Sequence, residues 1–345
     1  MPVALILEKA RALTLRDIDL DLTVGDDDVR IAMDVVGICG SDVHYFRHGK
    51  IGPFVVTEPM VLGHEGAGTV VTCGRNVRAL AVGDRVCIEP GIPDFSSRPS
   101  RIGLYNLDPS LTFWATPPVH GCLTPEVVHP ASLTFKLPDN VSFAEGAMVE
   151  PLAVGLQAVH KTGVAAGDVA LVLGAGPIGI LVALSALSAG CSRVLILDPA
   201  SKKLEIAAQY KGIQTLDAAN GPPIAQVLKA TDGWGVDLVY ECSGAAAAFN
   251  GIADCIRPGG TLACIGMPTV PVAIDIVALQ VKEIHIVTVF RYANVYDRAI
   301  ALLAEGRIDV KPLISATYPF PDSIAAFERA DAAHPQDVKI QIAMR

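Results

Sequence analysis

One stretch of about thirty residues constrains the fold of this chain more than any other. Val169–Leu173 is an apolar run of strand length, and it passes directly into the turn Gly174-Ala-Gly-Pro-Ile-Gly179. Residues 180–189 are rich in Leu, Ala and Val without proline, which predicts a helix that Gly190 ends. The order of strand, glycine turn and helix is that of a dinucleotide-binding unit.

Each residue of the glycine turn has a predicted role in binding a dinucleotide. Gly174 permits the tight turn, Gly176 lets a pyrophosphate approach the backbone, and Gly179 lets the helix pack closely on the strand. The N-terminus of the helix offers unpaired N–H groups and a positive dipole end to the phosphates, and Pro177 and Ile178 of the turn are predicted to contact the cofactor. The turn therefore predicts a phosphate-binding site.

A second apolar strand, residues 193–197, ends on Asp198, which lies 19 residues beyond Gly179. An acid at this position accepts hydrogen bonds from the adenosine ribose and repels a 2′-phosphate, so NAD is favoured over NADP. A membrane span is the alternative interpretation of residues 169–192, because they are uncharged and about 20 apolar residues cross a bilayer. The glycines and the proline that interrupt this run after five residues argue against a span.

Length and composition leave room for a second domain and exclude some partners. A chain of 345 residues is long enough for about two domains. Its net charge of −9, without a basic run, argues against nucleic acid and anionic membrane as partners. Eight scattered cysteines without a CxxC pair, and a start without a signal-peptide pattern, predict reduced thiols and a cytoplasmic location.

Residues 1–150 are predicted to form a compact β-rich domain. Turn signals such as residues 24–28 and 82–84 separate short runs with strand character, and no helix-length periodicity dominates. The expected strands are residues 4–7, 29–36, 68–71 and 85–88.

Two segments of this region carry candidate metal ligands. Cys39 lies in a Cys-Gly-Ser-Asp sequence, and His64 and Glu65 lie in Gly-His-Glu-Gly-Ala-Gly. A catalytic zinc needs about three such ligands and an open position. Taken singly, Cys39 could be a small buried apolar residue, His64 a core histidine and Glu65 a turn residue. The glycines beside each ligand allow the backbone to bend around an ion, which favours a zinc site.

Together the two segments resemble the zinc-dependent medium-chain dehydrogenase/reductase superfamily, and the resemblance covers the whole chain. It implies an α/β protein with a β-rich, GroES-like catalytic domain over residues 1–150 and an NAD-binding Rossmann domain over residues 151–290. The tail, residues 291–345, is expected to return to the catalytic domain, with the active site in the cleft between the two domains.

Six apolar runs from residue 169 onward match the number of strands in a doubly wound parallel sheet, for which the order 3-2-1-4-5-6 is expected. A turn over residues 255–260 is predicted to end a helix before the fifth strand. The tail is predicted to form helices near residues 294–305 and 323–333 and a strand at 338–343. The six runs are residues 169–173, 193–197, 213–216, 236–240, 261–265 and 285–289.

The resemblance also implies a catalytic zinc held by Cys39, His64 and a carboxylate. Where alcohol dehydrogenases of the superfamily place a second cysteine ligand, this chain has Glu150, which is typical of the polyol (sorbitol/xylitol) dehydrogenase branch. In that branch Glu65 ligates directly, while Glu150 ligates or holds the metal-bound water, and the two carboxylates could exchange during turnover.

The proton relay of the superfamily maps onto Ser41 and His44. These residues lie two and five positions after Cys39, as the relay hydroxyl and histidine do. Their ordinary alternatives are a serine that caps a turn and a surface histidine.

One departure from the superfamily concerns a second metal. Many relatives hold a structural zinc with four closely spaced cysteines, but no cysteine lies between Cys87 and Cys122. The lobe over residues 93–109 is expected to be retained in outline without its metal. One catalytic zinc per chain and no structural zinc are therefore predicted.

Further resemblance to the polyol branch concerns the pocket beside the zinc. A polyol presents several hydroxyls, which polar donors such as Arg291, Tyr45 and Tyr292 suit better than an apolar wall does. The aromatic residues, Phe54 and Phe113 in particular, could equally belong to the core. The positions implied for the substrate are Tyr45, Ile51, Phe54, Phe113, Thr116, Arg291 and Tyr292; those implied for the cofactor, besides the glycine turn and Asp198, are Lys203, Gly266, Met267, Val289, Phe290 and Arg291.

These features predict an NAD- and zinc-dependent enzyme that oxidises a sugar alcohol to a ketose, with xylitol to D-xylulose as the first choice. The alternative is another zinc alcohol dehydrogenase, acting on sorbitol, L-arabinitol, a butanediol or L-threonine. A non-catalytic nucleotide-binding relative would lack metal ligands, whereas all four candidates are present. The apolar composition and the resemblance to the branch favour a homotetramer.

Overall fold

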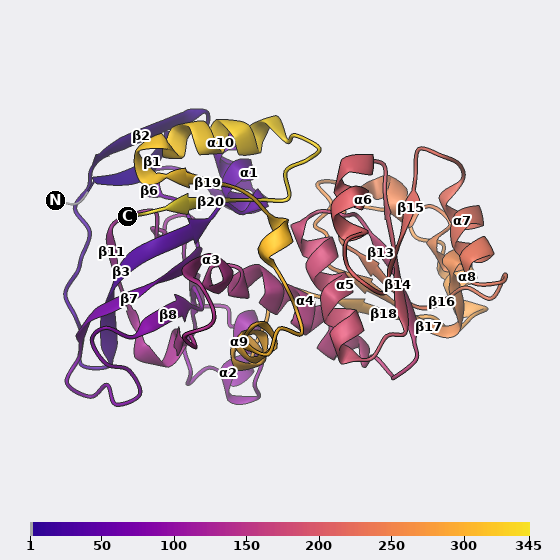
Figure 1. The fold of residues 1–345 in the computed structure, drawn as a ribbon, viewed down its shortest axis with the longest axis horizontal. Coiled ribbons are helices and arrows are strands. Elements are labelled where there is room, and N and C mark those ends of the chain that lie inside the picture. Colours follow the sequence, from indigo (N-terminus) through magenta and orange to yellow (C-terminus); the bar gives the residue numbers. More distant parts are fainter. Residues whose placement is uncertain (1–2) are drawn as a thin grey trace. The chain divides into compact units, whose positions relative to one another are not determined.

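The computed structural model describes residues 3–345, and these residues form two compact units. Unit 1 comprises the chain up to Glu150 together with Tyr296–Arg345, and unit 2 comprises Pro151–Val295. The chain therefore leaves unit 1 once and returns to it at Tyr296. Figure 1 shows the fold with the helices and strands labelled.

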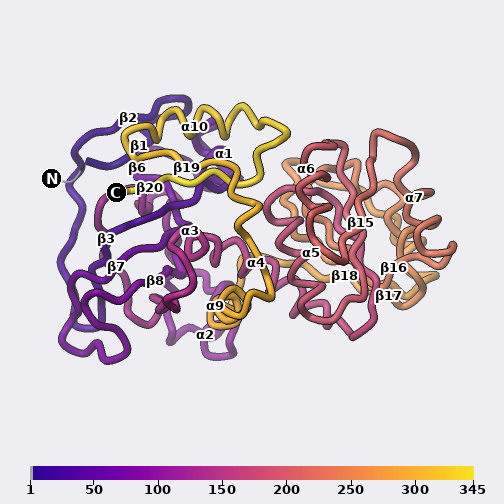
Figure 2. Tube along the Cα trace, in the orientation of Figure 1, coloured from indigo at the N-terminus to yellow at the C-terminus, as the bar shows by residue number. Residues whose placement is uncertain are grey.

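Unit 1 is built around a seven-stranded sheet that joins the two ends of the chain. The C-terminal strand β20 pairs antiparallel with β3, and the tube in Figure 2 shows the yellow C-terminal segment beside indigo N-terminal ones. The sheet runs β12 (Thr134–Lys136), β8 (Arg85–Ile88), β7 (Glu65–Cys73), β3 (Asp28–Gly37), β20 (Lys339–Ala343) and β19 (Ile314–Pro319), with β11 (Glu126–Pro130) also paired to β3.

Shorter elements complete unit 1. Three small sheets pair β2 (Ala12–Asp17) and β6 (Met60–Val61) with β1 (Val3–Lys9), β4 (Lys50–Ile51) with β5 (Phe54–Val55), and β9 (Gly91–Ile92) with β10 (Thr112–Phe113). The helices are α1 (Gly40–His48), α2 (Arg98–Arg101), α3 (Phe143–Gly146), α9 (Tyr296–Ala304) and α10 (Ser323–Ala332), and α4 (Val149–Thr162) leads into unit 2.

The core of unit 1 combines residues from both ends of the chain. Leu5, Ile31 and Leu62 are fully buried, and Phe327 of α10 and Ile342 of β20 pack into the same cluster. Burying each such side chain contributes about 1.5–3 kcal/mol. The C-terminal fifty residues are therefore an integral part of unit 1.

The sequence did not predict helix α1, which follows β3 almost directly. Its first turn is fixed by Asp42, whose carboxylate accepts a hydrogen bond from the Cys39 N–H at 3.0 Å. Gly49 ends the helix in the left-handed region, at φ 68°. Only three of its nine residues are buried, Asp42 and Tyr45 among them, so the helix has no apolar periodicity from which it could be predicted.

Unit 2 is a six-stranded parallel sheet, and its strand order confirms the prediction. From edge to edge the strands run β15, β14, β13, β16, β17 and β18, which in chain order is 3-2-1-4-5-6. The bounds are β13 (Val169–Leu173), β14 (Arg193–Asp198), β15 (Ile213–Asp217), β16 (Val236–Glu241), β17 (Ile256–Cys264) and β18 (His285–Thr288). The helices are α5 (Pro177–Ala189), α6 (Ser201–Ala207), α7 (Pro223–Ala230) and α8 (Ile276–Gln280).

The predicted turn at residues 255–260 is wrong, because most of it belongs to β17. A 3₁₀ turn, Ile252–Cys255, precedes the strand, and a register shift between Val236 and Leu238 of β16 accommodates the Pro-Gly-Gly sequence. The Arg257 guanidinium pairs with Asp237 across the two strands at 2.5 Å. Proline and glycine thus mark an irregular part of a strand at this position.

Helix α5 occupies the place that the sequence predicts for it. It begins at Pro177, and Gly190 follows its last residue with φ 128°. Every residue from Gly179 to Ala186 is buried. Among residues 3–345, no helix has both the length and the apolar character that crossing a membrane requires.

Candidate active site

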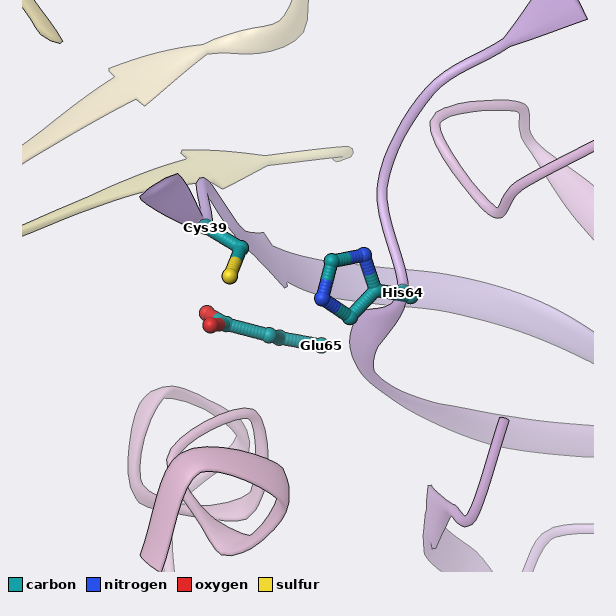
Figure 3. A group of neighbouring side chains, drawn as sticks. All are labelled: Cys39, His64 and Glu65. Carbon is teal, nitrogen blue, oxygen red and sulfur yellow. The ribbon is translucent and has the colours of Figure 1, made fainter. Parts of the chain in front are cut away.

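The structure brings Cys39, His64 and Glu65 together in unit 1. Cys39 is the N-cap of α1, His64 precedes β7, and Glu65 is the first residue of β7. Their sulfur, nitrogen and oxygen ligand atoms all lie within 4.8 Å of one another. Figure 3 shows the thiol, one imidazole nitrogen and the carboxylate pointing toward a common centre.

The chemistry and burial of this group fit a zinc ion. Zinc takes thiolate, imidazole and carboxylate ligands at about 2.0–2.3 Å, which places tetrahedral ligand atoms about 3.3–3.8 Å apart. The observed limit of 4.8 Å requires only small side-chain movements to reach that geometry. His64 and Glu65 are 5% and 1% exposed, so an ion bound between them would be shielded from water.

Glu65 can take this position only because residue 37 is glycine. Gly37 and Glu65 are register partners in the β3–β7 ladder. A Cβ atom added to Gly37 would lie 2.1 Å from the Glu65 carboxylate oxygen Oε2. Any other residue at 37 would therefore displace the carboxylate.

Asp42, the last residue of the Cys-Gly-Ser-Asp sequence, contacts both ligand segments, and no role was predicted for it. Its fully buried carboxylate accepts hydrogen bonds from the Cys39 N–H at 3.0 Å and from the Gly63 N–H at 3.1 Å. The same Oδ1 lies 3.6 Å from Nδ1 of His64. Asp42 thus ties together both ligand segments and leaves the other imidazole nitrogen facing Cys39 and Glu65.

The charges around His64 raise its affinity for a proton. Burial alone lowers the pKa of His64, but interactions with the Asp42 carboxylate and with Cys39 outweigh burial and raise that pKa well above its usual value. A cation with +2 charge at this centre would compete with that proton. The site therefore favours a positive charge in either form.

Lys339 is a second residue that the sequence analysis missed. Its ammonium donates to both carboxylate oxygens of Glu65 at 2.7 Å and to the Ile38 carbonyl at 3.2 Å. Burial lowers the pKa of Lys339, but the charges of Glu65 and Cys39 outweigh burial and raise it above its usual value. A lysine 274 positions from its partner offers no local sequence signal.

Glu150 does not belong to the group of three. It lies in the first turn of α4, is 6% exposed, and is close enough to act electrostatically on Lys339 and on Glu89. Burial raises the pKa of Glu89 to about 7, against a lowering hydrogen bond from the Tyr105 hydroxyl. Both carboxylates are buried, and Glu150 lies near Lys339, the ion-pair partner of Glu65.

The predicted relay residues lie together on α1. Ser41 is the second residue of the helix and is half-buried, and His44 stands one turn further on and is exposed. Burial, followed by the nearby charges of His48 and Arg47, lowers the pKa of His44. A largely neutral His44 is able to accept a proton near neutral pH.

Of the predicted substrate residues in unit 1, Phe113 lies beside the candidate ligand His64. Its ring centroid is 5.5 Å from that of His64. Tyr45, by contrast, is 3% exposed and belongs to the core cluster. Phe54 is 41% exposed, and Ile51 and Thr116 are half-buried.

The other predicted substrate residues follow β18 in unit 2. Arg291 adopts a positive φ of 53°, and its guanidinium lies 4.9 Å above the Phe290 ring. Tyr292 is 3% exposed. This loop therefore has a defined backbone and a stacked, cationic side chain.

The glycine turn of unit 2 has the backbone that a phosphate site needs. Gly174 has φ 102°, and a Cβ on Gly179 would lie 1.8 Å from the Gly174 carbonyl oxygen. Gly176, the N-cap of α5, is the exception, because a Cβ there would meet nothing within 4 Å. Gly174 and Gly179 thus serve the turn itself, while the space beside Gly176 is open to a ligand.

Asp198 is bound to the same turn. Its carboxylate accepts hydrogen bonds from the Ala175 and Ala200 N–H groups, both at 2.7 Å, at the end of β14. Lys203 is half-buried on α6. The acid and the turn therefore form one preorganised structure.

Three of the remaining predicted cofactor positions lie just beyond the ends of β17 and β18. The Gly266 N–H donates to the Glu241 carbonyl at 2.8 Å, and the Val289 N–H donates to Cys264 at 3.0 Å. Met267 is 68% exposed. These positions share the carboxyl edge of the sheet with the glycine turn, which is where doubly wound sheets bind ligands.

Two family models cover most of the chain. Residues 25–139 match the alcohol dehydrogenase GroES-like domain, and residues 177–305 match the zinc-binding dehydrogenase domain. D-xylulose reductase of Morganella morganii is 55% identical over 95% of this chain and 97% of its own length. The chain belongs to the zinc-dependent medium-chain dehydrogenases, in their polyol branch.

Two further comparisons agree with this assignment. Sorbitol dehydrogenase of Rattus norvegicus is 42% identical to this dehydrogenase, over 89% of the chain and 87% of the relative. The crystal structure of an Escherichia coli oxidoreductase/dehydrogenase of unknown specificity superposes with a TM-score of 0.95 at 35% identity, covering 100% of both chains. This dehydrogenase therefore resembles a sorbitol dehydrogenase in sequence over most of its length and a solved dehydrogenase structure in fold over all of it.

In this dehydrogenase, side-chain hydrogen bonds hold the lobe over residues 93–109. The lobe contains α2 and a 3₁₀ turn, Tyr105–Leu107. Asp108 accepts from the Asp94 N–H at 2.6 Å, and the Tyr105 hydroxyl donates to Glu89 at 2.7 Å. These contacts link the lobe to itself and to the end of β8.

Proposed function

We propose that this dehydrogenase oxidises a secondary hydroxyl of a sugar alcohol to a ketone with NAD, and that xylitol, giving D-xylulose, is its preferred substrate. The observation that carries the proposal is the convergence of Cys39, His64 and Glu65 in a chain that also has a preorganised dinucleotide turn. The full-length relative named D-xylulose reductase supports xylitol over sorbitol, because the sorbitol dehydrogenases are less similar.

The residues of unit 1 are proposed to hold zinc and to move the proton. Cys39, His64 and Glu65 would ligate the ion, with Glu150 as the exchanging carboxylate or the partner of a water. When bound, zinc polarises the substrate hydroxyl and makes it more acidic. Asp42 keeps the imidazole oriented, Ser41 receives the hydroxyl proton, and His44 delivers it to solvent.

The residues of unit 2 are proposed to select and orient the cofactor. The first turn of α5 offers N–H groups to the pyrophosphate, and Asp198 offers its carboxylate to the adenosine ribose. A 2′-phosphate would meet that negative charge, which supports NAD over NADP. When bound, NAD would supply the hydride acceptor, and the residues of the chain would align donor and acceptor and exclude water.

Arg291 and Tyr292 are proposed to bind the additional hydroxyls of the substrate. The positive φ of Arg291 and its stacking on Phe290 hold a cationic donor in one place. A fixed donor discriminates strongly against a substrate that lacks the matching hydroxyl. This argument favours polyols over simple aliphatic alcohols.

Initial rates with a panel of alcohols test the proposal. The panel comprises xylitol, sorbitol, L-arabinitol, 2,3-butanediol and L-threonine, each with NAD and with NADP. We expect the highest kcat/KM for xylitol with NAD. A higher value for L-threonine or butanediol would assign the chain to another activity of the family, and no turnover with any substrate would contradict an enzymatic role.

We further propose that the chain holds one zinc and no structural zinc. Four-cysteine chelation is impossible in the lobe over residues 93–109, and hydrogen bonds among its own side chains support it instead. Metal analysis of the purified protein should give one zinc per chain. A value of two would contradict this stoichiometry.

A homotetramer is the proposed assembly, with the β18 edge of unit 2 as one interface. Within residues 3–345, β18 pairs only with β17, and β18 and the segment that precedes it in the chain, residues 276–281, carry exposed apolar side chains. A second copy would cover them and extend the sheet across a two-fold axis. Sedimentation should give a mass four times that of the chain. Separately, the eight free cysteines support a cytoplasmic location. The apolar residues are Ile276, Val277, Val281 and Ile286, which are 45–77% exposed.

A further inference from the structure

One buried cation lies within the candidate metal site. The ammonium of Lys339 contacts both carboxylate oxygens of Glu65 at 2.7 Å, and the two side chains are 2% and 1% exposed. A third hydrogen bond, to the Ile38 carbonyl at 3.2 Å, fixes the ammonium next to the segment that carries Cys39. A buried ion pair of this kind persists only when its partners are held in place.

The position of Lys339 in β20 determines the face of the sheet on which its side chain lies. Ile340 and Ile342 point into the core cluster of unit 1, so alternation along β20 turns Lys339 and Gln341 to the opposite face. Gln341 lies opposite Gly37, which is also the register partner of Glu65. Lys339 is therefore a fixed feature of the ligand side of the sheet.

The charges show what a fixed lysine does at this place. Cys39 and the Glu65 and Glu150 carboxylates all act on Lys339 electrostatically. A second cation held by the same ligands must share Glu65 with the ammonium, because each carboxylate oxygen has two lone-pair positions. The second cation and the Lys339 ammonium would then lie close together in a weakly polar environment, where two positive charges repel each other.

We infer that Lys339 is a positioning residue for the metal: it holds the Glu65 carboxylate in the metal-free form and competes with zinc for that carboxylate in the loaded form. Glu65 is thereby kept oriented but weakly bound, which allows the exchange with Glu150 that the proposed function includes. The inference rests on that function, since it presupposes a zinc at Cys39, His64 and Glu65.

Zinc binding to Lys339→Met tests the inference without any measurement of turnover. The substitution keeps the length of the side chain and removes its charge. In a competition titration with a chromophoric chelator, we expect Lys339→Met to bind zinc at least tenfold more tightly than the unaltered chain. The metal-free variant should melt at a lower temperature, and zinc should raise its Tm by more than it raises that of the unaltered chain.

The visible spectrum of bound Co²⁺ provides an independent readout. If Glu65 is shared with Lys339, the substitution changes the ligand field, so the d–d bands should shift. Lys136→Met is the matched control, because Lys136 pairs with Asp84 on the surface of the same unit. This control should leave zinc affinity and the Co²⁺ bands unchanged.

A double substitution separates an effect through Glu65 from general repulsion. In a Glu65→Gln background the lysine has no carboxylate to share. The factor by which Lys339→Met raises zinc affinity should therefore be at least three times smaller in this background than in the unaltered chain. This background also removes the unpaired buried carboxylate, so it is expected to fold even if the single variant does not.

The outcomes distinguish this inference from the proposed function. Equal or weaker zinc binding by Lys339→Met, unchanged Co²⁺ bands, or the same gain in both backgrounds would overturn the role of Lys339 and leave the dehydrogenase proposal intact. Failure of the unaltered chain to bind zinc would contradict the proposed function itself.

Discussion

Single carboxylates set the geometry of the candidate metal site. Asp42 contributes no ligand atom, yet it binds both ligand segments through the Cys39 and Gly63 N–H groups. Glu65 takes its place because Gly37 leaves room for it. At this scale the site is preorganised by groups behind the ligands, and their removal should weaken metal binding without removing a ligand.

Replacing Asp42 with asparagine should reduce zinc affinity by about 10- to 100-fold. One of its two carboxylate oxygens becomes an N–H₂ group, which cannot accept the hydrogen bond from Cys39 or Gly63. Zinc content after dialysis against a graded chelator series measures the loss. Asp34→Asn is the control, since Asp34 accepts from the Thr69 hydroxyl away from the ligands; an equal loss in both variants would contradict a specific role.

Glu89 should make the stability of the chain depend on pH. Its pKa is about 7 in the folded chain, where burial and the charges of Glu150 and Asp297 raise it, against a usual value of 4.5. Between these two pH values the folded form keeps a proton that the unfolded form has lost. The contribution of Glu89 to the free energy of unfolding is therefore fully present below pH 4.5 and is lost as the pH rises through 7. The whole change amounts to at most about 3 kcal/mol.

Glu89→Gln should remove this dependence. Urea unfolding at pH 5 and pH 8 should show the variant gaining stability relative to the unaltered chain at the higher pH. Glu58→Gln, at an exposed position, is the control and should show no such difference. If the free energy of unfolding of both variants changed with pH in the same way, Glu89 would be excluded as the source of the pH dependence.

At the scale of elements, β13, the glycine turn and α5 form the part of the molecule whose shape follows most directly from its sequence. The strand and the C-terminal end of the helix are observed where they are predicted. Two glycines of the turn have different surroundings. Gly179 has no space for a side chain, whereas Gly176 faces open space.

Alanine at each of these glycines should therefore have different effects. Gly179→Ala places a methyl group against the Gly174 carbonyl, so it should lower the stability of the chain by more than about 2 kcal/mol. Gly176→Ala meets no protein atom and should fold normally, but should raise the Kd for NAD at least tenfold. Thermal melting and NAD titration measure the two effects, and equal loss of stability in both variants would contradict this division.

At the scale of the whole molecule, metal and protons are linked. The metal-free ligands favour a proton on His64, and zinc has to displace it. Zinc loading should consequently release protons, and acidification should release zinc.

Metal removal tests this linkage. Treatment with a chelator should abolish dinucleotide reduction, and added zinc should restore it. In weakly buffered solution at neutral pH, a titration with zinc should release about one proton or more per chain. Restoration of activity by zinc without any proton release would show that the ligands are already deprotonated.

The sequence by itself determined the elements whose signals are local. Periodicity, glycines and strand length predicted β13 and α5, because such a unit needs only neighbouring residues to define its backbone. The strand order followed from the doubly wound fold that this unit indicates. The motifs around Cys39 and His64 likewise indicated zinc chemistry, because the ligand types and their flanking glycines lie within short segments.

Only the tertiary structure decided which other groups meet those ligands. Helix α1 has too few buried residues to be read from its pattern, and it exists because Asp42 and the surrounding sheet fix its first turn. Lys339 reaches Glu65 because β20 closes the sheet beside β3. Pairing between strands far apart in the chain leaves no trace in either segment, so the cation that faces the ligands became visible only in the folded molecule.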